Sequence, residues 1–162
     1  MSNIIDKKSL LLYNKPMKAE IITRSGTKKE FIHAVTSFFI QELNLKNSRY
    51  TLSVFTKSGL VKESGMNGFA SDFGEKQLVV FIDSRLNMDQ TVRTLAHEMV
   101  HVKQMATGKL RYKTIRGKHI PFWNGKKVQV NYEDRPWEHQ AWGKELILAN
   151  RLWALLRVKN KY

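Results

Sequence analysis

Two histidines and one glutamate, at a fixed spacing, are the residues of this chain best suited to do chemistry. In the stretch LAHEMVHVKQ, residues 95–104, His97 and His101 stand four positions apart and Glu98 follows the first histidine. Residues four apart share one face of an α-helix, so both imidazoles can bind one metal ion at about 2.0–2.1 Å. Glu98 lies about 100° round the helix from His97, where its carboxylate can reach a water molecule on the metal. The spacing predicts a zinc-binding helix with Glu98 as general base; the alternative is an amphipathic helix that carries two histidines without a metal.

A third ligand must come from elsewhere, and the composition restricts its type. The chain has no cysteine, so only histidine, aspartate and glutamate are left to complete a zinc site. On a helix over residues 136–158, measured from Trp137, Glu138 and Glu145 fall at about 100° and 80°, on the apolar face, whereas His139 falls at about 200°. A carboxylate on an apolar face is costly unless a cation or a hydrogen-bond donor compensates it.

We therefore predict that Glu138 is the third metal ligand and that Glu145 is a buried acceptor orienting a ligand histidine or an arginine. The alternative for Glu138 is a first-turn carboxylate that stabilises the helix N-terminus, and for Glu145 it is an ordinary salt bridge. His119 and His139 are reserve ligands.

Periodicity and chain-breaking residues predict the elements that must position these side chains. Apolar residues recur at helical spacing over residues 27–43, 88–107 and 136–158. The second helix would begin at a cap on Asn87 or Asp89 and end at Gly108, and Pro136 would open the third. Two β-rich runs, residues 49–56 and 77–83, flank a glycine-containing segment and suggest a small antiparallel sheet. A hairpin with turns near RGKH and NGKK precedes the last helix.

Length and composition predict one domain over residues 1–162, with residues 1–26 loosely packed, because 162 residues can bury a single core but are few for two. The chain is 42% hydrophobic and 26% charged, and no apolar run approaches the roughly 20 residues that span a bilayer. No export signal is recognisable at the N-terminus. We expect a cytoplasmic protein with no membrane partner.

A formal net charge of +14 raises the question of an anionic partner. Residues 109–127 hold seven cations and no acid, and Tyr112, Phe122 and Trp123 lie between them. This pattern is typical of surfaces that follow a nucleic-acid backbone and stack on its bases, although a solvated basic hairpin has the same composition. The basic residues are Lys109, Arg111, Lys113, Arg116, Lys118, Lys126 and Lys127.

The segments TLAHEMVHVKQMATGKL, FWNGKK and NYEDRPWEHQAWGKE resemble the zincin metallopeptidases, and more narrowly the small SprT-like and phage-type metallopeptidases. The resemblance covers about residues 65–148. It matches His97 and His101 to the family's helix ligands, Glu98 to its catalytic base and Glu138 to the glutamate of its Pro-Trp-Glu element. Relatives often carry a second acid where this chain has Gln140, and SprT-like proteins more often use a third histidine.

The resemblance implies an α+β zincin-like domain in which an antiparallel sheet packs against the active-site helix and a long C-terminal helix. It also implies one Zn²⁺ per chain, hydrolysis of a protein or peptide substrate by metal-activated water, and a phage-encoded protein in the host cell. Tyr132, Arg135, His119 and His139 are candidate donors to the oxyanion. The run QLVVFID could bind substrate as an added strand, or could be an interior strand. Gln104 could fix the hairpin, or could be an exposed amide.

Two other functions fit the same residues. One is a basic module that binds nucleic acid or protein, in which the metal only ties helices together. The other is a catalytically silent zincin with a plugged cleft. A structural site needs no acid beside the metal, so the effect of changing Glu98 to glutamine separates the first of these from the peptidase.

Overall fold

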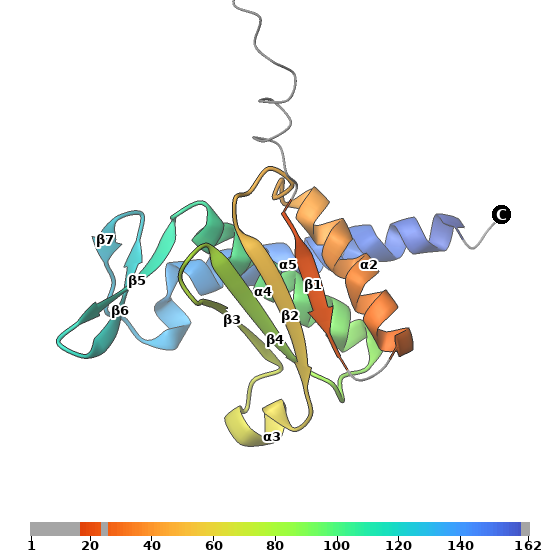
Figure 1. Ribbon diagram of the computed structural model, residues 1–162, viewed down its shortest axis with the longest axis horizontal. Helices are drawn as coiled ribbons and strands as arrows, with labels where there is room; N and C mark the ends of the chain where they lie inside the picture. The colour runs from red at the N-terminus through yellow and green to blue at the C-terminus, as the bar shows by residue number, and fades with distance from the viewer. Residues whose placement is uncertain (1–16, 24–25, 160–162) are drawn as a thin grey trace, which may run out of the picture.

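The computed structural model describes residues 17–23 and 26–159, which form two sheets and several helices (Figure 1). The predicted α+β class, with an antiparallel strand pair and a long C-terminal helix, is confirmed. The elements in chain order are β1 (Ala19–Ile22), α2 (Gly26–Glu42), β2 (Thr51–Lys57), α3 (Leu60–Ser64), β3 (Gly68–Asp72), β4 (Gln77–Asp83), α4 (Met88–Ala106), β5 (Leu110–Ile115), β6 (Lys118–Trp123), β7 (Lys126–Lys127), the 3-10 turn Tyr132–Asp134 and α5 (Pro136–Lys159).

The larger sheet has the strand order β1-β2-β4-β3. Antiparallel pairing is found between β3 and β4, whereas β2 and β4, the two runs identified in the sequence, lie parallel to each other. They are parallel because the chain reverses direction twice between them, once at α3 and once at the turn that joins β3 to β4. The sequence analysis missed β3, whose short run GFASD has little of the β-branched character that marks a strand.

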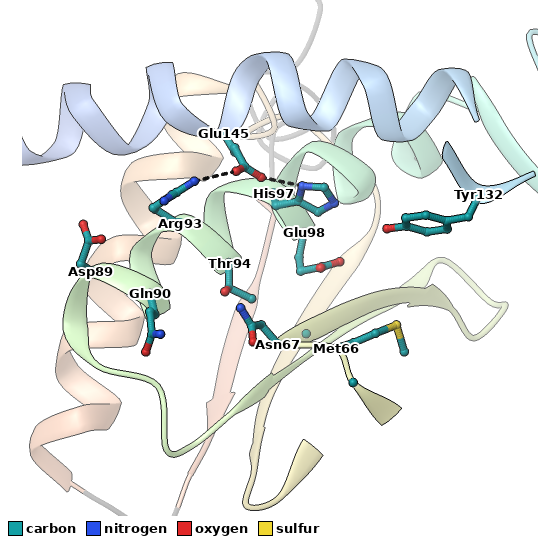
Figure 2. Close-up of a pocket in the computed structure, with 12 residues that line it drawn as sticks. Met66, Asn67, Asp89, Gln90, Arg93, Thr94, His97, Glu98, Tyr132 and Glu145 are labelled. Atoms are coloured by element: carbon teal, nitrogen blue, oxygen red, sulfur yellow. Dashed lines mark hydrogen bonds and ion pairs between the residues drawn. The ribbon is translucent and has the colours of Figure 1, made fainter. Parts of the chain in front are cut away.

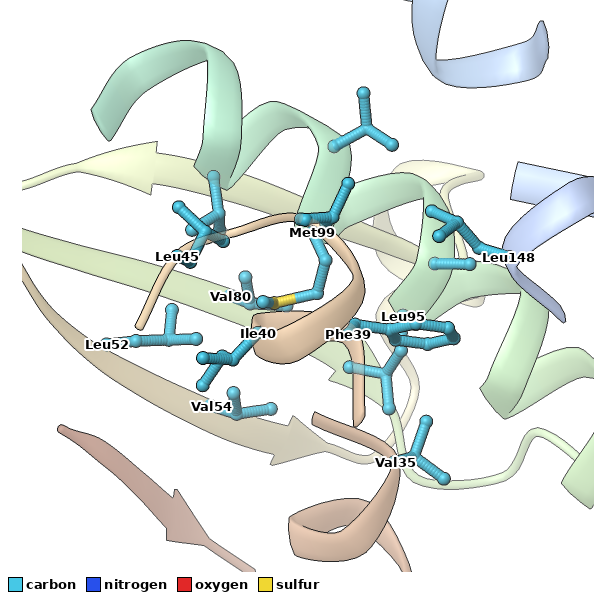
Figure 3. Close-up of a cluster of buried hydrophobic side chains, with 14 of the residues drawn as sticks. Val35, Phe39, Ile40, Leu45, Leu52, Val54, Val80, Leu95, Met99 and Leu148 are labelled. Atoms are coloured by element: carbon cyan, nitrogen blue, oxygen red, sulfur yellow. The ribbon is translucent and has the colours of Figure 1, made fainter. Parts of the chain in front are cut away.

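Helices α2 and α4 cover one face of this sheet, and α5 packs along α4 (Figure 1). Phe39 of α2, Val54 and Val80 of the central strands, and Leu95 and Met99 of α4 meet between these layers and are completely buried (Figure 3). This core fixes the position of α4, the helix that carries the two histidines.

The second sheet has the order β5-β6-β7 and lies beyond the β3 edge of the larger one (Figure 1). Its two turns fall at Arg116-Gly117 and Asn124-Gly125, within the predicted RGKH and NGKK segments. All four residues have positive φ, between 49° and 78°, as type I′ hairpin turns require. The hairpin is attached to the core through Leu110, which is 3% exposed.

Residues 1–16 and 24–25 lie outside the described residues, so the loose packing predicted for residues 1–26 can be examined only in part. Within that range, β1 pairs with β2 as an edge strand, and Ile21 and Met17 are buried in the core. In the described part of the chain, no helix is long and apolar enough to cross a membrane.

Candidate metal centre

Helix α4 presents the histidines because its other face is committed to the sheet. Asn87 caps its N-terminus by accepting a hydrogen bond from the backbone N–H of Gln90, whose side chain accepts in return from the Asn87 N–H. Leu95 and Met99 face the sheet and are completely buried. His97 and His101 lie on the side of the helix that faces α5.

Helix α5 brings the predicted third ligand to these histidines. Trp137 and Ala141 on its first turns are buried against the core, at 2% and 0% exposure. Glu138 therefore points inward and is only 7% exposed. Its carboxylate meets both imidazoles, although 37 residues separate it from His101 in the chain.

The three side chains place one donor atom each at the corners of a nearly regular triangle. His97 Nε2 lies 3.1 Å from His101 Nε2 and 3.1 Å from Glu138 Oε2, and His101 Nε2 lies 3.4 Å from the same carboxylate oxygen. Ligands at about 2.0–2.1 Å from a tetrahedral ion are separated by about 3.3–3.4 Å, since the edge of a tetrahedron is 1.63 times that radius. The triangle therefore fits three of the four positions around such an ion.

The outer nitrogens of both imidazoles are held by acceptors. His97 Nδ1 donates to Glu145 Oε2 at 2.7 Å, and the same carboxylate binds Arg93 at 3.3 Å (Figure 2). His101 Nδ1 lies 2.8 Å from Gln104 Oε1. The Gln104 amide is oriented by its Nε2, which donates to the Trp137 backbone carbonyl at 3.0 Å, so its oxygen must face His101.

These hydrogen bonds determine which nitrogen of each imidazole carries the proton. With a proton on each Nδ1, a neutral imidazole has only a lone pair on Nε2. The lone pairs of His97 and His101 then converge with a carboxylate oxygen, and such a group is stable only with a cation or an added proton among them. His97, His101 and Glu138 could thus hold a metal ion, and their N₂O donor set is one that zinc accepts.

Electrostatic effects inside the cluster favour a cation. Burial alone would lower the pKa of His97, but hydrogen bonds to Glu138 and Glu145 and the charge of Glu98 raise it to about 9. Burial alone would raise the pKa of Glu138, but hydrogen bonds to both histidines and their charges hold it well below its ordinary value. The same field that retains a proton at this place would attract a metal ion.

Glu98 lies beside the triangle without joining it. Its side chain is 6% exposed, and burial raises its pKa to about 7, against the opposing charges of His101 and His97. The carboxylate also accepts a hydrogen bond from the backbone of Ala70 in β3. A carboxylate with a pKa near neutrality, next to a metal position, is suited to take and return a proton.

The cluster opens into a pocket of about 720 Å³ (Figure 2). His97 and Glu98 of α4 form one wall, and Met66 and Gly68 at the start of β3 form another. A β-carbon on Gly68 would lie 2.8 Å from Thr94 Cγ2 of α4 and 2.7 Å from a β4 carbonyl oxygen, so glycine here allows the edge strand to lie close to α4. Figure 2 shows the Tyr132 ring reaching into the pocket with its hydroxyl directed toward Glu98.

The remaining predicted residues are divided between the site and the surface. Tyr132 lies near Glu138, and burial together with that charge raises its pKa to about 12. Arg135 stacks on the Tyr132 ring, with its guanidinium carbon 5.1 Å from the ring centre, and lines the hollow around the cluster. His139 is exposed and binds the Glu133 carbonyl, and His119 is exposed on β6, so neither joins the cluster. The seven basic residues are exposed on β5, β6, β7 and the adjoining turns.

Comparisons with known proteins give no identification. No family model, no curated protein and no solved structure matches the chain. A function must therefore be argued from these residues and their geometry.

Four features of the site escaped the sequence analysis. Arg93, one turn before His97 on the same helix face, pairs with Glu145, and the i, i−4 spacing was the available signal. Gln104 is 1% exposed and binds α5 rather than the hairpin, bridging to the Gln140 side chain at 3.0 Å. Tyr112 lines the hollow around the cluster. The edge strand beside the site is β3, whereas QLVVFID forms β4, an interior strand.

Proposed function

We propose that this protein is a zinc-dependent metalloendopeptidase, in which His97, His101 and Glu138 hold the metal and Glu98 is the general base. The observation that carries the proposal is the triangle of three acceptor atoms with a buried carboxylate beside it. The resemblance to zincins assigns the same four residues to the same roles. The spacing of the motif brings the two histidines together, whereas the contact of Glu138 with both of them depends on how α5 packs against α4.

His97, His101 and Glu138 would hold the zinc ion, which would supply a lowered pKa of bound water, toward about 7, and polarisation of a substrate carbonyl group. Glu98 accepts the proton of the attacking water and donates it to the leaving amine. In the metal-free protein, burial raises the pKa of Glu98 to about 7, so this carboxylate holds a proton more readily than an exposed glutamate. The Ala70 backbone N–H holds the carboxylate in place between the two proton transfers.

Tyr132 is our candidate for the donor that stabilises the oxyanion. Its hydroxyl enters the pocket beside Glu98, and a pKa of about 12 keeps that hydroxyl protonated at neutral pH. Arg135, stacked on the Tyr132 ring, positions the phenol and is itself a second candidate. His139 and His119 are not proposed for this role, because neither lines the pocket at the cluster or the hollow around it.

Changing Glu98 to glutamine tests the proposal. The amide has the same shape but cannot take a proton, so hydrolysis of an unfolded protein substrate should fall by about 10²–10⁴-fold while one zinc per chain is retained. Elemental analysis of the same preparations gives the zinc content. His101→Ala and Glu138→Ala should lose both zinc and activity, and Glu63→Gln, in an exposed ion pair with Lys57, should lose neither.

The outcomes separate the competing functions. Full activity in Glu98→Gln would contradict the role of the base. Bound zinc without hydrolysis in the wild type would favour a binding module or a catalytically silent site. No zinc, even after it is supplied, would refute the metal site.

A further inference from the structure

The pocket at the cluster is one part of a longer groove. It shares Gly68 and Tyr132 with a second hollow around His101 and Glu138, and that hollow shares Ala70 and Tyr112 with a third, of about 600 Å³. The third hollow lies between β3 and β5. A polypeptide bound across the cluster and along β3 would therefore continue into the space between the two sheets.

Both walls of that third hollow are strand edges to which no other strand is paired, although the Ala70 N–H of β3 already donates to Glu98. In the β3–β4 pair, backbone hydrogen bonds join Asp83 to Asn67 and Phe73 to Gln77. Because hydrogen-bonded pairs alternate along an antiparallel ladder, the backbone groups of Gly68, Ala70 and Asp72 point away from β4. In the β5–β6 pair, the Asn124 N–H bonds to the Lys109 carbonyl, and the same alternation directs those of Tyr112 and Thr114 outward. An extended peptide could hydrogen bond to the β5 edge, and to the outward groups of β3 other than the Ala70 N–H.

Cations dominate the side chains of this hollow. Arg111 and Lys113 line it, and Asp72 is the one carboxylate among its lining residues. Asp72 already accepts a hydrogen bond from the Gly74 backbone N–H. Neither Arg111 nor Lys113 has an ion-pair partner among residues 17–23 and 26–159, and Lys113 is held with its ammonium nitrogen 4.4 Å from the centre of the Phe122 ring.

We propose that the β3–β5 hollow binds an extended, acidic segment of the substrate, and that Arg111 and Lys113 are specificity-determining residues for it. This inference rests on the proposed peptidase function and names the class of substrate: polypeptides that carry aspartate or glutamate on one side of the bond to be cut. Each cation stands next to an outward-facing backbone group of β5, so a strand that bonds to the edge brings its side chains within reach of both charges.

A peptide fits this hollow better than a nucleic acid. Its walls offer backbone N–H and C=O groups from two strands, which complement another polypeptide. Lys126 and Lys127 on β7, which are two other cations of the β5-β6-β7 sheet, do not line any part of the groove.

The test compares two peptides of about ten residues, one with three acidic residues and one with the corresponding amides. Binding is measured by fluorescence anisotropy with zinc-loaded Glu98→Gln protein, and hydrolysis with protein that keeps Glu98. The double variant Arg111→Ala/Lys113→Ala is set against Lys126→Ala/Lys127→Ala, which removes the same charge from the same sheet. Thermal unfolding confirms that both variants are folded.

We expect the acidic peptide to bind more tightly than the amide peptide, and the Arg111/Lys113 variant to reduce that preference by about three- to tenfold. The Lys126/Lys127 variant should leave it unchanged. A preference that persists in the first variant, or falls equally in both, would overturn the inference. So would a single-stranded oligonucleotide that binds in an Arg111- and Lys113-dependent manner when the acidic peptide does not bind.

The two measurements distinguish failure of the proposed peptidase function from failure of the inference about the groove. If the peptides bind with the expected charge preference but are not cut, the inference about the groove stands and the peptidase function is wrong. If both are cut at the same rate and bind equally, the peptidase function stands and the inference is wrong.

Discussion

Replacing Glu145 with glutamine should weaken zinc binding without removing any metal ligand. Glu145 accepts the Nδ1 proton of His97 at 2.7 Å and so leaves the His97 Nε2 lone pair for the metal. The amide oxygen of glutamine can still accept that proton, but it carries no charge. The variant therefore measures the electrostatic contribution of the carboxylate alone.

The size of the effect follows from the hydrogen bond. A bond to a charged group contributes about 1.5–3 kcal/mol and a neutral one about 0.5–1.5 kcal/mol, so the substitution removes about 1–2 kcal/mol. The Glu145 side chain is 18% exposed, which limits screening by water. Since 1.4 kcal/mol corresponds to tenfold, the zinc dissociation constant should rise by about 5- to 30-fold.

Competition with a chromogenic chelator measures that constant, and Glu63→Gln is the control for loss of one negative charge. In the metal-free protein the same substitution should lower the pKa of His97 from about 9, because one of the carboxylates that raise it is gone. A zinc affinity within about twofold of the wild type, or an equal loss in the control, would refute the view that Glu145 tunes a metal ligand.

Three further predictions concern pH, packing and catalysis. Burial raises the pKa of Glu98 to about 7. Burial would lower the pKa of His97, but the neighbouring carboxylates raise it to about 9. The native metal-free protein therefore retains protons that the unfolded chain releases. Its free energy of unfolding should thus fall as pH rises from 4.5 to about 9. Zinc should raise Tm more at pH 8 than at pH 6, and calorimetry that shows a larger increase in Tm at pH 6 would contradict this. Gly68→Ala places a β-carbon 2.7 Å from a β4 carbonyl and should lower the free energy of unfolding by about 1–3 kcal/mol. Gly143→Ala, in a helix with open space around it, should raise the free energy of unfolding by up to about 1 kcal/mol. Denaturant titration of both variants measures these changes. Tyr132→Phe should lower kcat by about 10²–10³-fold with zinc content unchanged, and an unchanged kcat would remove it as the oxyanion donor.

The sequence was most informative where a local pattern repeats over several turns. Helices α4 and α5 lie within one or two residues of their predicted ranges, because their apolar periodicity, the Asn87 cap and Pro136 are all local signals. Helical phase also placed Glu138 on the inward face of α5. What it could not give is the distance from α5 to α4, which depends on how two helices pack across the core.

Strand order and edges were the least predictable features. Nothing local in GFASD distinguishes β3 from a loop, yet its position next to β4 makes it the edge beside the candidate site. The same limit applies to Gln104, which we predicted either to fix the hairpin or to be an exposed amide. It is buried only because α5 crosses α4 at that point, so that its amide meets the Trp137 carbonyl.

The way α4 and α5 are held together bears on whether the metal site is structural or catalytic. A structural zinc site is closed by four protein ligands and often replaces a core too small to fold alone. Here the described residues bring three candidate ligands together, and α5 already has a buried apolar face in the core through Trp137, Ala141, Leu148 and Leu152. Because that contact and the Gln104 bridge do not involve the metal, the helices have reason to stay packed without it. If a metal ion binds as we propose, these three residues would hold it in a site formed in advance by the fold and would leave one position for a substrate.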